Sequence, residues 1–551
     1  MRFRHILLAV AAGLALADAS VVTLALPELL RELNTSVEGV AAVLIVYAAV
    51  IVVALIPAEL LQRRLGAPRM AAAGLMLFAA ASLVCSVSGS LGMLLAARAV
   101  QAAGGAAALV AAFGLLEPQG AAGARGRRLW LGTAVLAAAV GPALGGALTE
   151  ALSWRAIFYV QAPVAALAAL AAWQEPRPAP VPAVDPADAP RTQPGPAIAL
   201  ALVSAALTSV LFLLVLLLVA GWDVSPLRAA VAVSVIPAGA LVGSRIPGAP
   251  RARAAAGCAL VGAGVLALAF LPDARLLWTV LPQAAAGLGM GLALPALGGD
   301  LLPERDARDA SRLLTLRHVG IVAALLILAP IVSAQLASST DRARERGVAV
   351  VLDARLPPAD KIRLAPSLLA GVEDDQPRAG LRSALAAGRT QIAAADRPAY
   401  ADLATRADDT LVLAVGEAFR TAFLVTGALA LLAALAVLPR RRPSRPQALA
   451  LAAATAVILP LGYLGLHAAV APKPVALRDP CRPRALPHTG GLLGAAQDAV
   501  LSTLDTTACR AGSTREELVL ALADERDRRR FEQEHGVDPR SLSNVLQALL
   551  G

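Results

Sequence analysis

Apolar stretches recur along the whole chain and are separated by short polar segments. Each stretch has about 18 to 25 residues, enough to cross a hydrocarbon core of roughly 30 Å as a helix that satisfies its own backbone hydrogen bonds. Strands of a β-barrel would alternate in polarity and be about half as long. The pattern therefore predicts an all-α polytopic membrane protein. The expected spans cover residues 6–28, 38–61, 70–88, 92–115, 130–149, 157–173, 197–221, 226–243, 254–272, 277–298, 314–336, 410–438 and 447–470.

The expected spans form two sets of six, followed by one extra span. The string Gly-Ala-Pro-Arg stands at 66–69, between spans 2 and 3, and again at 248–251, between spans 8 and 9. A repeat at matching positions indicates two pseudo-symmetric halves. Transporters built from duplicated halves bind substrate at the interface between the halves, near the membrane midplane. The expected segments are a first bundle over 1–173, a Pro/Ala-rich cytoplasmic linker over 174–196, a second bundle over 197–438 and the extra span over 447–470.

Composition and charge agree with a lipid environment. Hydrophobic residues make up 58% of the chain and charged residues 16%. The net charge of +10 does not indicate a nucleic-acid partner, because the arginines form short clusters and no continuous basic face. These clusters predict a bacterial-type plasma membrane protein with a cytoplasmic amino terminus. The short outside loops would then hold only Arg31, Arg155, Arg228 and Arg275.

Two large polar regions would lie outside the membrane on the extracytoplasmic side, an insertion over 337–408 and a tail over 472–551. The tail contains Cys481 and Cys509, which an oxidising compartment would allow to form a disulfide; the alternative is two free thiols in a cytoplasmic tail. Ser513 and Glu516 have the spacing of a helix capping box. We expect a small helical tail, whose partner, if any, the sequence does not identify.

Ionisable side chains inside the spans are costly and point to function. Asp18 lies well inside span 1 and could exchange a proton, or it could be a structural partner for an arginine. Arg98 in span 4 keeps its charge, so it could hold a neighbouring acid ionised, or it could form a salt bridge that serves packing alone. Gln101 lies one helical turn further along the same face. Asp18 and Arg98 are our candidates for proton coupling.

Further candidates are gate, cavity or conformational residues. Glu59 near the inner end of span 2, with Gln101, Arg317 and His318, could line a gate or cavity, although Arg317 or His318 could instead reach the membrane surface. Span 5 carries a short segment of glycines and a proline. This segment would let a neighbouring helix approach closely, or it would simply kink the helix. Its members are Gly141, Pro142, Gly145 and Gly146.

The sequence contains no sign of an enzyme or of a bound cofactor. The tail has no paired-cysteine zinc motif, and no phosphate-binding Gly-Lys-Ser/Thr loop occurs. Without a nucleotide-binding domain, the energy for transport would come from an ion gradient or from the gradient of the substrate itself.

These residues together resemble the major facilitator superfamily, most closely its drug:proton antiporter branch. The resemblance covers about residues 5–440 and implies two six-helix bundles that alternate between inward- and outward-open states. It assigns Asp18 to protonation, Arg98 to proton coupling and the span 5 string to the antiporter motif. The strings that carry it are Asp18-Ala-Ser-Val-Val-Thr-Leu-Ala-Leu-Pro27, Arg98-Ala-Val-Gln101, Gly141 to Gly146, Trp154 to Pro163 and Ser311 to Gly320.

The chain departs from the branch in three ways. Arg63 stands three residues before Gly66, where the branch has an acid, the linker lacks two further spans, and aromatic residues are only 3%. We still expect a proton-coupled exporter whose partners are protons, lipid and small apolar or amphipathic compounds. Two alternatives are a nutrient importer or facilitator, and a transporter-derived scaffold or sensor that binds an extracytoplasmic partner.

Overall fold

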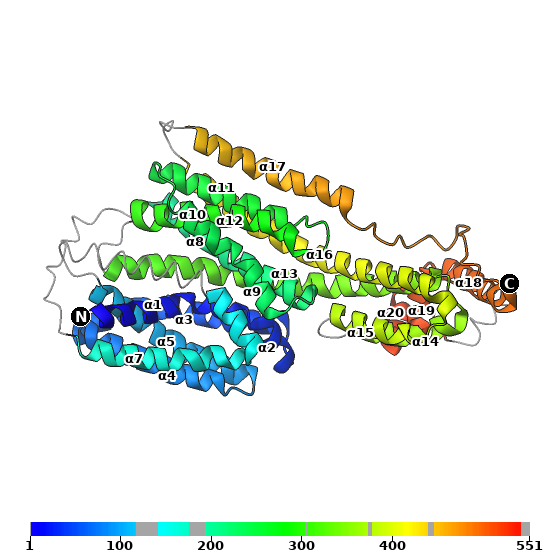
Figure 1. Cartoon of the computed structure of the whole chain (residues 1–551), viewed down its shortest axis with the longest axis horizontal. Coiled ribbons are helices and arrows are strands. Elements are labelled where there is room, and N and C mark those ends of the chain that lie inside the picture. Colours follow the sequence, from blue (N-terminus) through cyan, green and yellow to red (C-terminus); the bar gives the residue numbers. More distant parts are fainter. Residues whose placement is uncertain are drawn as a thin grey trace. The chain divides into compact units, whose positions relative to one another are not determined.

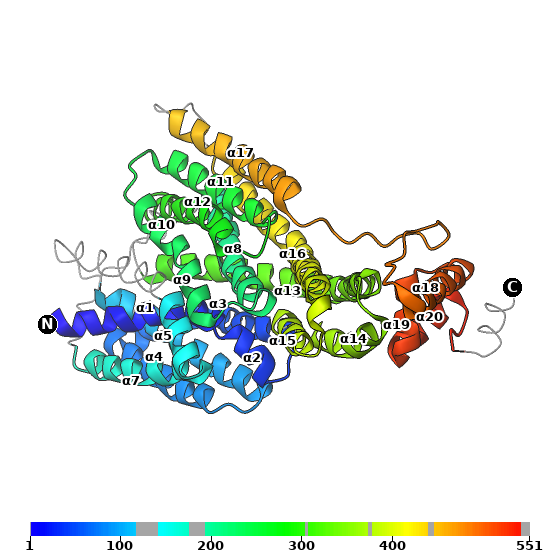
Figure 2. The same cartoon turned by 45° about the vertical axis from the view of Figure 1, so that its right-hand side comes forward.

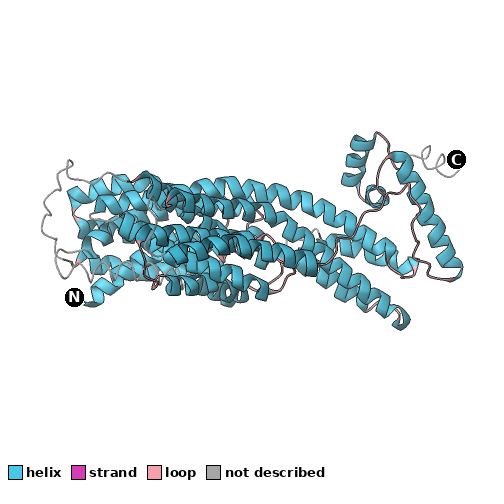
Figure 3. Cartoon of the chain, turned by 90° about the horizontal axis from the view of Figure 1, so that it is seen from above, coloured by secondary structure: helices cyan, strands magenta, loops and turns pink. Residues whose placement is uncertain are grey.

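The computed structural model describes residues 2–116, 141–175, 193–302, 307–372, 377–438 and 446–540. These residues form helices and loops and no strand (Figure 3). The chain divides into two compact units. The first comprises Met1–Val219, Val224–Ala334 and Phe419–Ala469, and the second comprises Ala220–Asp223, Gln335–Ala418 and Val470–Gly551. Most of the expected linker, residues 176–192, and the start of the fifth expected span lie outside the described residues.

The first half of the first unit is a bundle of long helices (Figure 1). Ser36 caps α3 by accepting a hydrogen bond from the amide of Gly39. Gly66, with a φ of 82°, ends α3, and Pro68 stands in the first turn of α4, where its missing amide hydrogen costs nothing. The elements are α1 Arg2–Thr23, α2 Leu26–Glu32, α3 Val37–Leu65, α4 Ala67–Ser86, α5 Leu91–Leu116, a helix over residues 141–151, and α7 Trp154–Trp173.

The second half repeats this arrangement, but one of its expected spans is divided into two helices. The span expected at 226–243 is two helices that meet at Ser234. Pro237, one turn further on, cannot donate a backbone hydrogen bond, so the ladder breaks there. The elements are α8 Pro194–Val215 with a π-turn over Leu216–Gly221, α9 Pro226–Val233, α10 Val235–Gly243, α11 Pro250–Leu268, α12 Leu276–Pro295 with a π-turn over Ala296–Leu301, α13 Ala307–Asp353, α16 Arg397–Ala436 and α17 Pro446–Val470.

A pair of glycines brings two helices into backbone contact at the same place in each half. In the first half, a Cβ on Gly74 of α4 would lie 2.9 Å from the carbonyl oxygen of Gly104 in α5. In the second half, a Cβ on Gly257 of α11 would lie 2.6 Å from the carbonyl oxygen of Gly289 in α12. Gly74 and Gly257 each follow one copy of the Gly-Ala-Pro-Arg string. The sequence repeat therefore marks a structural repeat.

Eleven helices among the described residues are long and apolar enough to cross a membrane. The two remaining expected spans are α1, whose apolar stretch Ile6–Leu16 is shorter, and 130–149, which is only partly described. The extra helix α17 lies beside α11 in both side views (Figures 1 and 2), and only 11% of its apolar window is buried. Its Tyr463 hydroxyl donates to the carbonyl of Trp278 at 2.7 Å. Such a helix has a face suited to lipid.

The second unit is built on the continuations of α13 and α16. We expected these spans to end at 336 and to begin at 410, but α13 continues to Asp353 and α16 begins at Arg397. Falling hydropathy ends a span but not a helix, and no proline occurs between Pro330 and Pro357. Between α13 and α16 the chain forms α14 Pro358–Val372 and α15 Pro377–Arg389. The tail forms α18 Gly491–Ala511, α19 Arg515–Ala523 and α20 Glu525–His535.

Covalent and ionic contacts hold the tail together. Cys481 and Cys509 form a disulfide. The capping box of α19 uses Thr514 and Glu517, one residue later than the sequence spacing indicated. Arg515 is fully buried and pairs with Asp353 of α13 at 2.7 Å. The tail thus packs on the end of α13 within the second unit.

Candidate functional site

A fully buried ion pair joins α1 and α5. The Nη2 atom of Arg98 lies 2.6 Å from Oδ2 of Asp18, and neither side chain is exposed. Moving two charges out of water costs more than their attraction returns unless further hydrogen bonds satisfy them. The structure therefore has to supply such partners for both groups.

Two glutamines supply most of these partners. Gln161 of α7 donates from Nε2 to Oδ1 of Asp18 at 3.2 Å, and Gln101 accepts from Nη1 of Arg98 at 2.6 Å. Gln101 in turn donates to Gln161 at 3.0 Å and to the hydroxyl of Ser82 at 2.8 Å. The members of this network bond to one another, so the orientation of the two charged groups is fixed and both are shielded from lipid.

Aromatic rings cover the guanidinium of Arg98. Its central carbon lies 4.2 Å from the ring centre of Tyr47 and 5.6 Å from that of Phe158. Cation–π attraction of this kind contributes about 2 kcal/mol when the pair is desolvated. The Tyr47 hydroxyl donates to the carbonyl of Ala15 at 3.1 Å, which fixes the ring between α3 and α1.

The position of Gln161 is set at the start of α7. Trp154 is fully buried there; its indole donates to Glu32 at 2.8 Å, and its amide donates to Glu28 at 3.1 Å. Arg155 also pairs with Glu32. Because both acids belong to α2, which follows α1 directly, these contacts tie α7 to the helix that carries Asp18.

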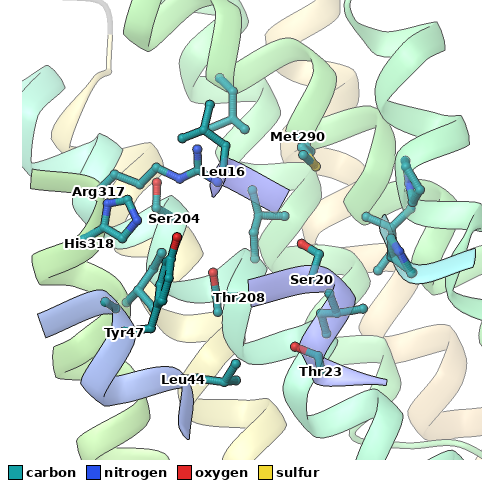
Figure 4. Close-up of a pocket in the computed structure, with 18 of the residues that line it drawn as sticks. Leu16, Ser20, Thr23, Leu44, Tyr47, Ser204, Thr208, Met290, Arg317 and His318 are labelled. Atoms are coloured by element: carbon teal, nitrogen blue, oxygen red, sulfur yellow. The ribbon is translucent and has the colours of Figure 1, made fainter. Parts of the chain in front are cut away.

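A central cavity of about 90 Å³ lies between the two halves (Figure 4). By a measure in which one water needs roughly 10–15 Å³, this is room for several waters, so a larger substrate would require the cavity to widen. Tyr47 is part of the wall, whereas Asp18 and Arg98 are not. Tyr47 therefore stands between the cavity and the buried ion pair. Polar lining groups include Ser20, Thr23, Ser204 and Thr208.

The structure divides the gate and cavity candidates into three groups. Arg317 and His318 both line the cavity, on the side shared with Ser204 (Figure 4). Gln101 lies in the buried network instead. Glu59 is outside both; its carboxylate accepts from Arg63 at 2.6 Å on the same helix.

The glycine-proline string forms a contact between the halves. Gly141 is buried, and Pro142 lines the cavity. A Cβ on Gly145 would lie 2.4 Å from the carbonyl oxygen of Val21 in α1, and one on Gly146 would lie 2.3 Å from Cβ of Ala230 in α9. This helix therefore touches α1 on one side and α9, from the other half, on the other.

Sequence reasoning missed Tyr47, Gln161 and Ser82. Gln161 carried a usable signal, an amide inside an apolar helix. Tyr47 carried none, because an aromatic ring in an apolar helix most often packs against lipid or core.

The described residues contain one group that could hold a metal, formed by Glu517, Glu534 and His535 in the tail. His535 already pairs with Glu517 at 3.1 Å, and Glu534 with Arg530 at 3.1 Å. These contacts explain the cluster without a metal.

Two pseudo-symmetric helical halves around a central cavity, with a buried ion pair beside it, are typical of secondary transporters. A family model described as Major Facilitator Superfamily matches residues 8–323, more than half of the chain. The chain belongs to this family, and it is a transporter and not an enzyme.

Three of the similar relatives have names that refer to drug resistance or efflux. The chain is 32% identical over 174 residues to the multidrug resistance protein Stp of Mycobacterium tuberculosis, 30% of this chain and 32% of that protein. It is 31% identical over 153 residues to the drug efflux pump JefA of the same organism, 27% and 30% of the two chains. It is 31% identical over 172 residues to the methylenomycin A resistance protein of Bacillus subtilis, 31% and 37%. The chain matches about a third of the length of these relatives.

Among solved structures, the chain is similar to a bacterial homolog of the human lysosomal transporter Spinster in an inward-facing, occupied conformation. The TM-score is 0.56 at 16% identity, over 79% of this chain and 96% of that one. At this identity the similarity shows the fold alone.

Proposed function

We propose that the protein is a proton-coupled exporter of small, largely apolar or amphipathic compounds that works by alternating access. The observation that carries this proposal is the buried pair of Asp18 and Arg98 beside the cavity. A carboxylate at such a place is suited to exchange a proton. The names of the relatives support export as the direction of transport and drug-like compounds as the substrates.

Protonation of Asp18 would change the balance of the network. A proton on Oδ2 removes the charge that attracts Arg98, while Gln101 and the ring of Tyr47 remain as its partners. The force that holds α1 against α5 falls, and the contact of the 141–151 helix with α1 and α9 is the surface that moves. Release of the proton on the other side restores the pair. Proton entry is thereby coupled to one direction of the transport cycle.

We place this protein in a bacterial inner membrane with its amino terminus in the cytoplasm and the second unit outside. The distribution of arginines in the loops supports this orientation. So does the Cys481–Cys509 disulfide, because disulfides persist in oxidising compartments.

The direct test uses purified protein in liposomes with an imposed pH gradient. We expect gradient-driven flux of an apolar fluorescent dye with the wild type, and its loss in Asp18→Asn. The matched control is Asp402→Asn, which changes an acid that is 71% exposed and should leave flux unchanged. Equal gradient-driven flux in Asp18→Asn and wild type would refute the coupling mechanism.

A further inference from the structure

The cavity holds one charged side chain without a counter-ion. Arg317 is partly buried, and no acid stands among the described residues that line the cavity. Within the described part of the chain Arg317 forms no ion pair or hydrogen bond. Arg98, beside the cavity, is by contrast paired with Asp18. A lone guanidinium facing a largely apolar cavity is costly, so it requires a functional explanation.

A hydroxyl beside Arg317 is unpaired as well. Ser204 of α8 is 3% exposed, lines the cavity and has no hydrogen-bond partner in the part of the chain that the structure describes. The two residues meet because α13 touches α8 closely at Gly320, where a Cβ would lie 2.1 Å from the carbonyl oxygen of Ala201. Arg317 lies one turn before Gly320 and Ser204 one turn after Ala201, which places both donors on the same wall (Figure 4).

His318 adds a third polar atom to this wall. Its Nδ1 lies 2.7 Å from the carbonyl oxygen of Leu314. A carbonyl can only accept, so Nδ1 carries the hydrogen and Nε2 is the ring nitrogen left for other contacts.

The rest of the lining is mainly apolar. Leu16, Leu44, Met290, Leu294 and Ile321 all contribute to it. Figure 4 shows Met290 across the cavity from the Arg317 side. A ligand that satisfies this cavity has an apolar body and a single anionic group. A lipophilic cation would instead face the unscreened charge of Arg317 in a site of low dielectric.

We propose that the substrates are amphipathic organic anions, whose acidic group binds to Arg317 and the Ser204 hydroxyl while the apolar body fills the remaining cavity. This inference rests on the proposed export function and specifies its substrate class. The anion has two donors at the polar wall, and the planar guanidinium can hold a carboxylate through two parallel hydrogen bonds.

The test compares two probes with the same ring system, the anionic 1-naphthoate and the neutral 1-naphthamide, bound to the full-length protein in detergent without any gradient. We expect the wild type to bind the carboxylate at least about tenfold more tightly, since hydrogen bonds to a charged group are worth that much. Arg317→Gln should remove this preference. Arg317→Lys should keep part of it, because the charge stays and the paired geometry is lost. Ser204→Ala should weaken carboxylate binding alone.

The matched control is Arg312→Gln, an arginine of the same helix that is 52% exposed and does not line the cavity; it should keep the preference. Binding in detergent without a gradient does not need proton coupling. Failure of the coupling mechanism would thus leave this result intact. Equal binding of the two probes by the wild type, no binding of the carboxylate, or an unchanged preference in Arg317→Gln would overturn the proposal.

Discussion

The guanidinium of Arg98 lies 4.2 Å from the centre of the Tyr47 ring, and the same ring forms part of the cavity wall. One side of Tyr47 therefore contacts the buried charge, and the other faces the space in which substrate would bind. A single side chain in this position can control both the stability of the ion pair and its access to water.

Shortening the side chain of Tyr47 should separate these two roles. Tyr47→Phe keeps the ring over Arg98 and loses only the hydrogen bond to Ala15. We expect it to transport nearly as well as wild type, with a stability loss of about 1 kcal/mol. Tyr47→Leu removes the ring, and we expect proton leak into liposomes in the absence of substrate. A pH-sensitive dye inside the liposomes measures the leak. Tight liposomes with Tyr47→Leu would show that the ring is not a barrier.

Adding a methyl group at Gly146 should impair transport. Its Cβ would lie 2.3 Å from that of Ala230, so the 141–151 helix and α9 would have to move apart. We expect Gly146→Ala to reduce flux at least about tenfold, because overpacking a tight contact typically costs 1–3 kcal/mol. Gly462→Ala in α17 is the control, since nothing lies within 4 Å of its added Cβ. Normal flux in Gly146→Ala would mean that this contact does not need to be tight.

Much of the candidate site was accessible from the sequence because its charges stand out in apolar helices. Asp18 and Arg98 were recognisable separately, and the spacing from Arg98 to Gln101 placed an amide on the same face of α5. Their direct pairing was not readable, because the rotation of α1 against α5 is set by packing and not by local sequence. The same limit hid Tyr47, whose role depends entirely on what lies behind its ring.

Helix ends were less predictable than helix positions. Hydropathy located the span that became α13 but could not show that the helix continues through polar residues to Asp353. The break at Ser234 could have been suspected from Pro237, but many transmembrane helices tolerate a proline.

The disulfide between Cys481 and Cys509 should stabilise the second unit. It closes a loop with a sequence separation of 28. We expect Cys481→Ala with Cys509→Ala to lose about 2–4 kcal/mol of stability in this unit, measured by denaturant melts of the tail helices. Thiol counting on unfolded wild type should detect only Cys85 and Cys258 before reduction, and all four cysteines after it. Four reactive thiols in unreduced protein would contradict the bond and the oxidising location that it supports.

Lys361 should make the stability of the second unit rise at alkaline pH. It is 7% exposed, and its ammonium donates to the carbonyl of Leu352 at 2.7 Å. Burial lowers the pKa of Lys361 from 10.5 to about 8, while Asp353 opposes this shift and Arg515 adds to it. Below pH 8 both the folded and the unfolded chain carry the proton, so the folded state bears the full cost of the buried charge. Between pH 8 and 10.5 the unfolded chain binds more protons than the folded one, and stability increases with pH.

The measurement is the melting temperature of the second unit from pH 7 to pH 10.5, for wild type and for Lys361→Met, which keeps most of the side-chain length without the charge. The advantage of the methionine variant over wild type should be greatest at pH 7, and the difference between the two melting temperatures should fall steadily above pH 8. Lys473→Met, at an exposed position, is the matched control and should follow the wild-type curve. Parallel curves for Lys361→Met and wild type would show that the buried ammonium does not govern the alkaline stability of this unit.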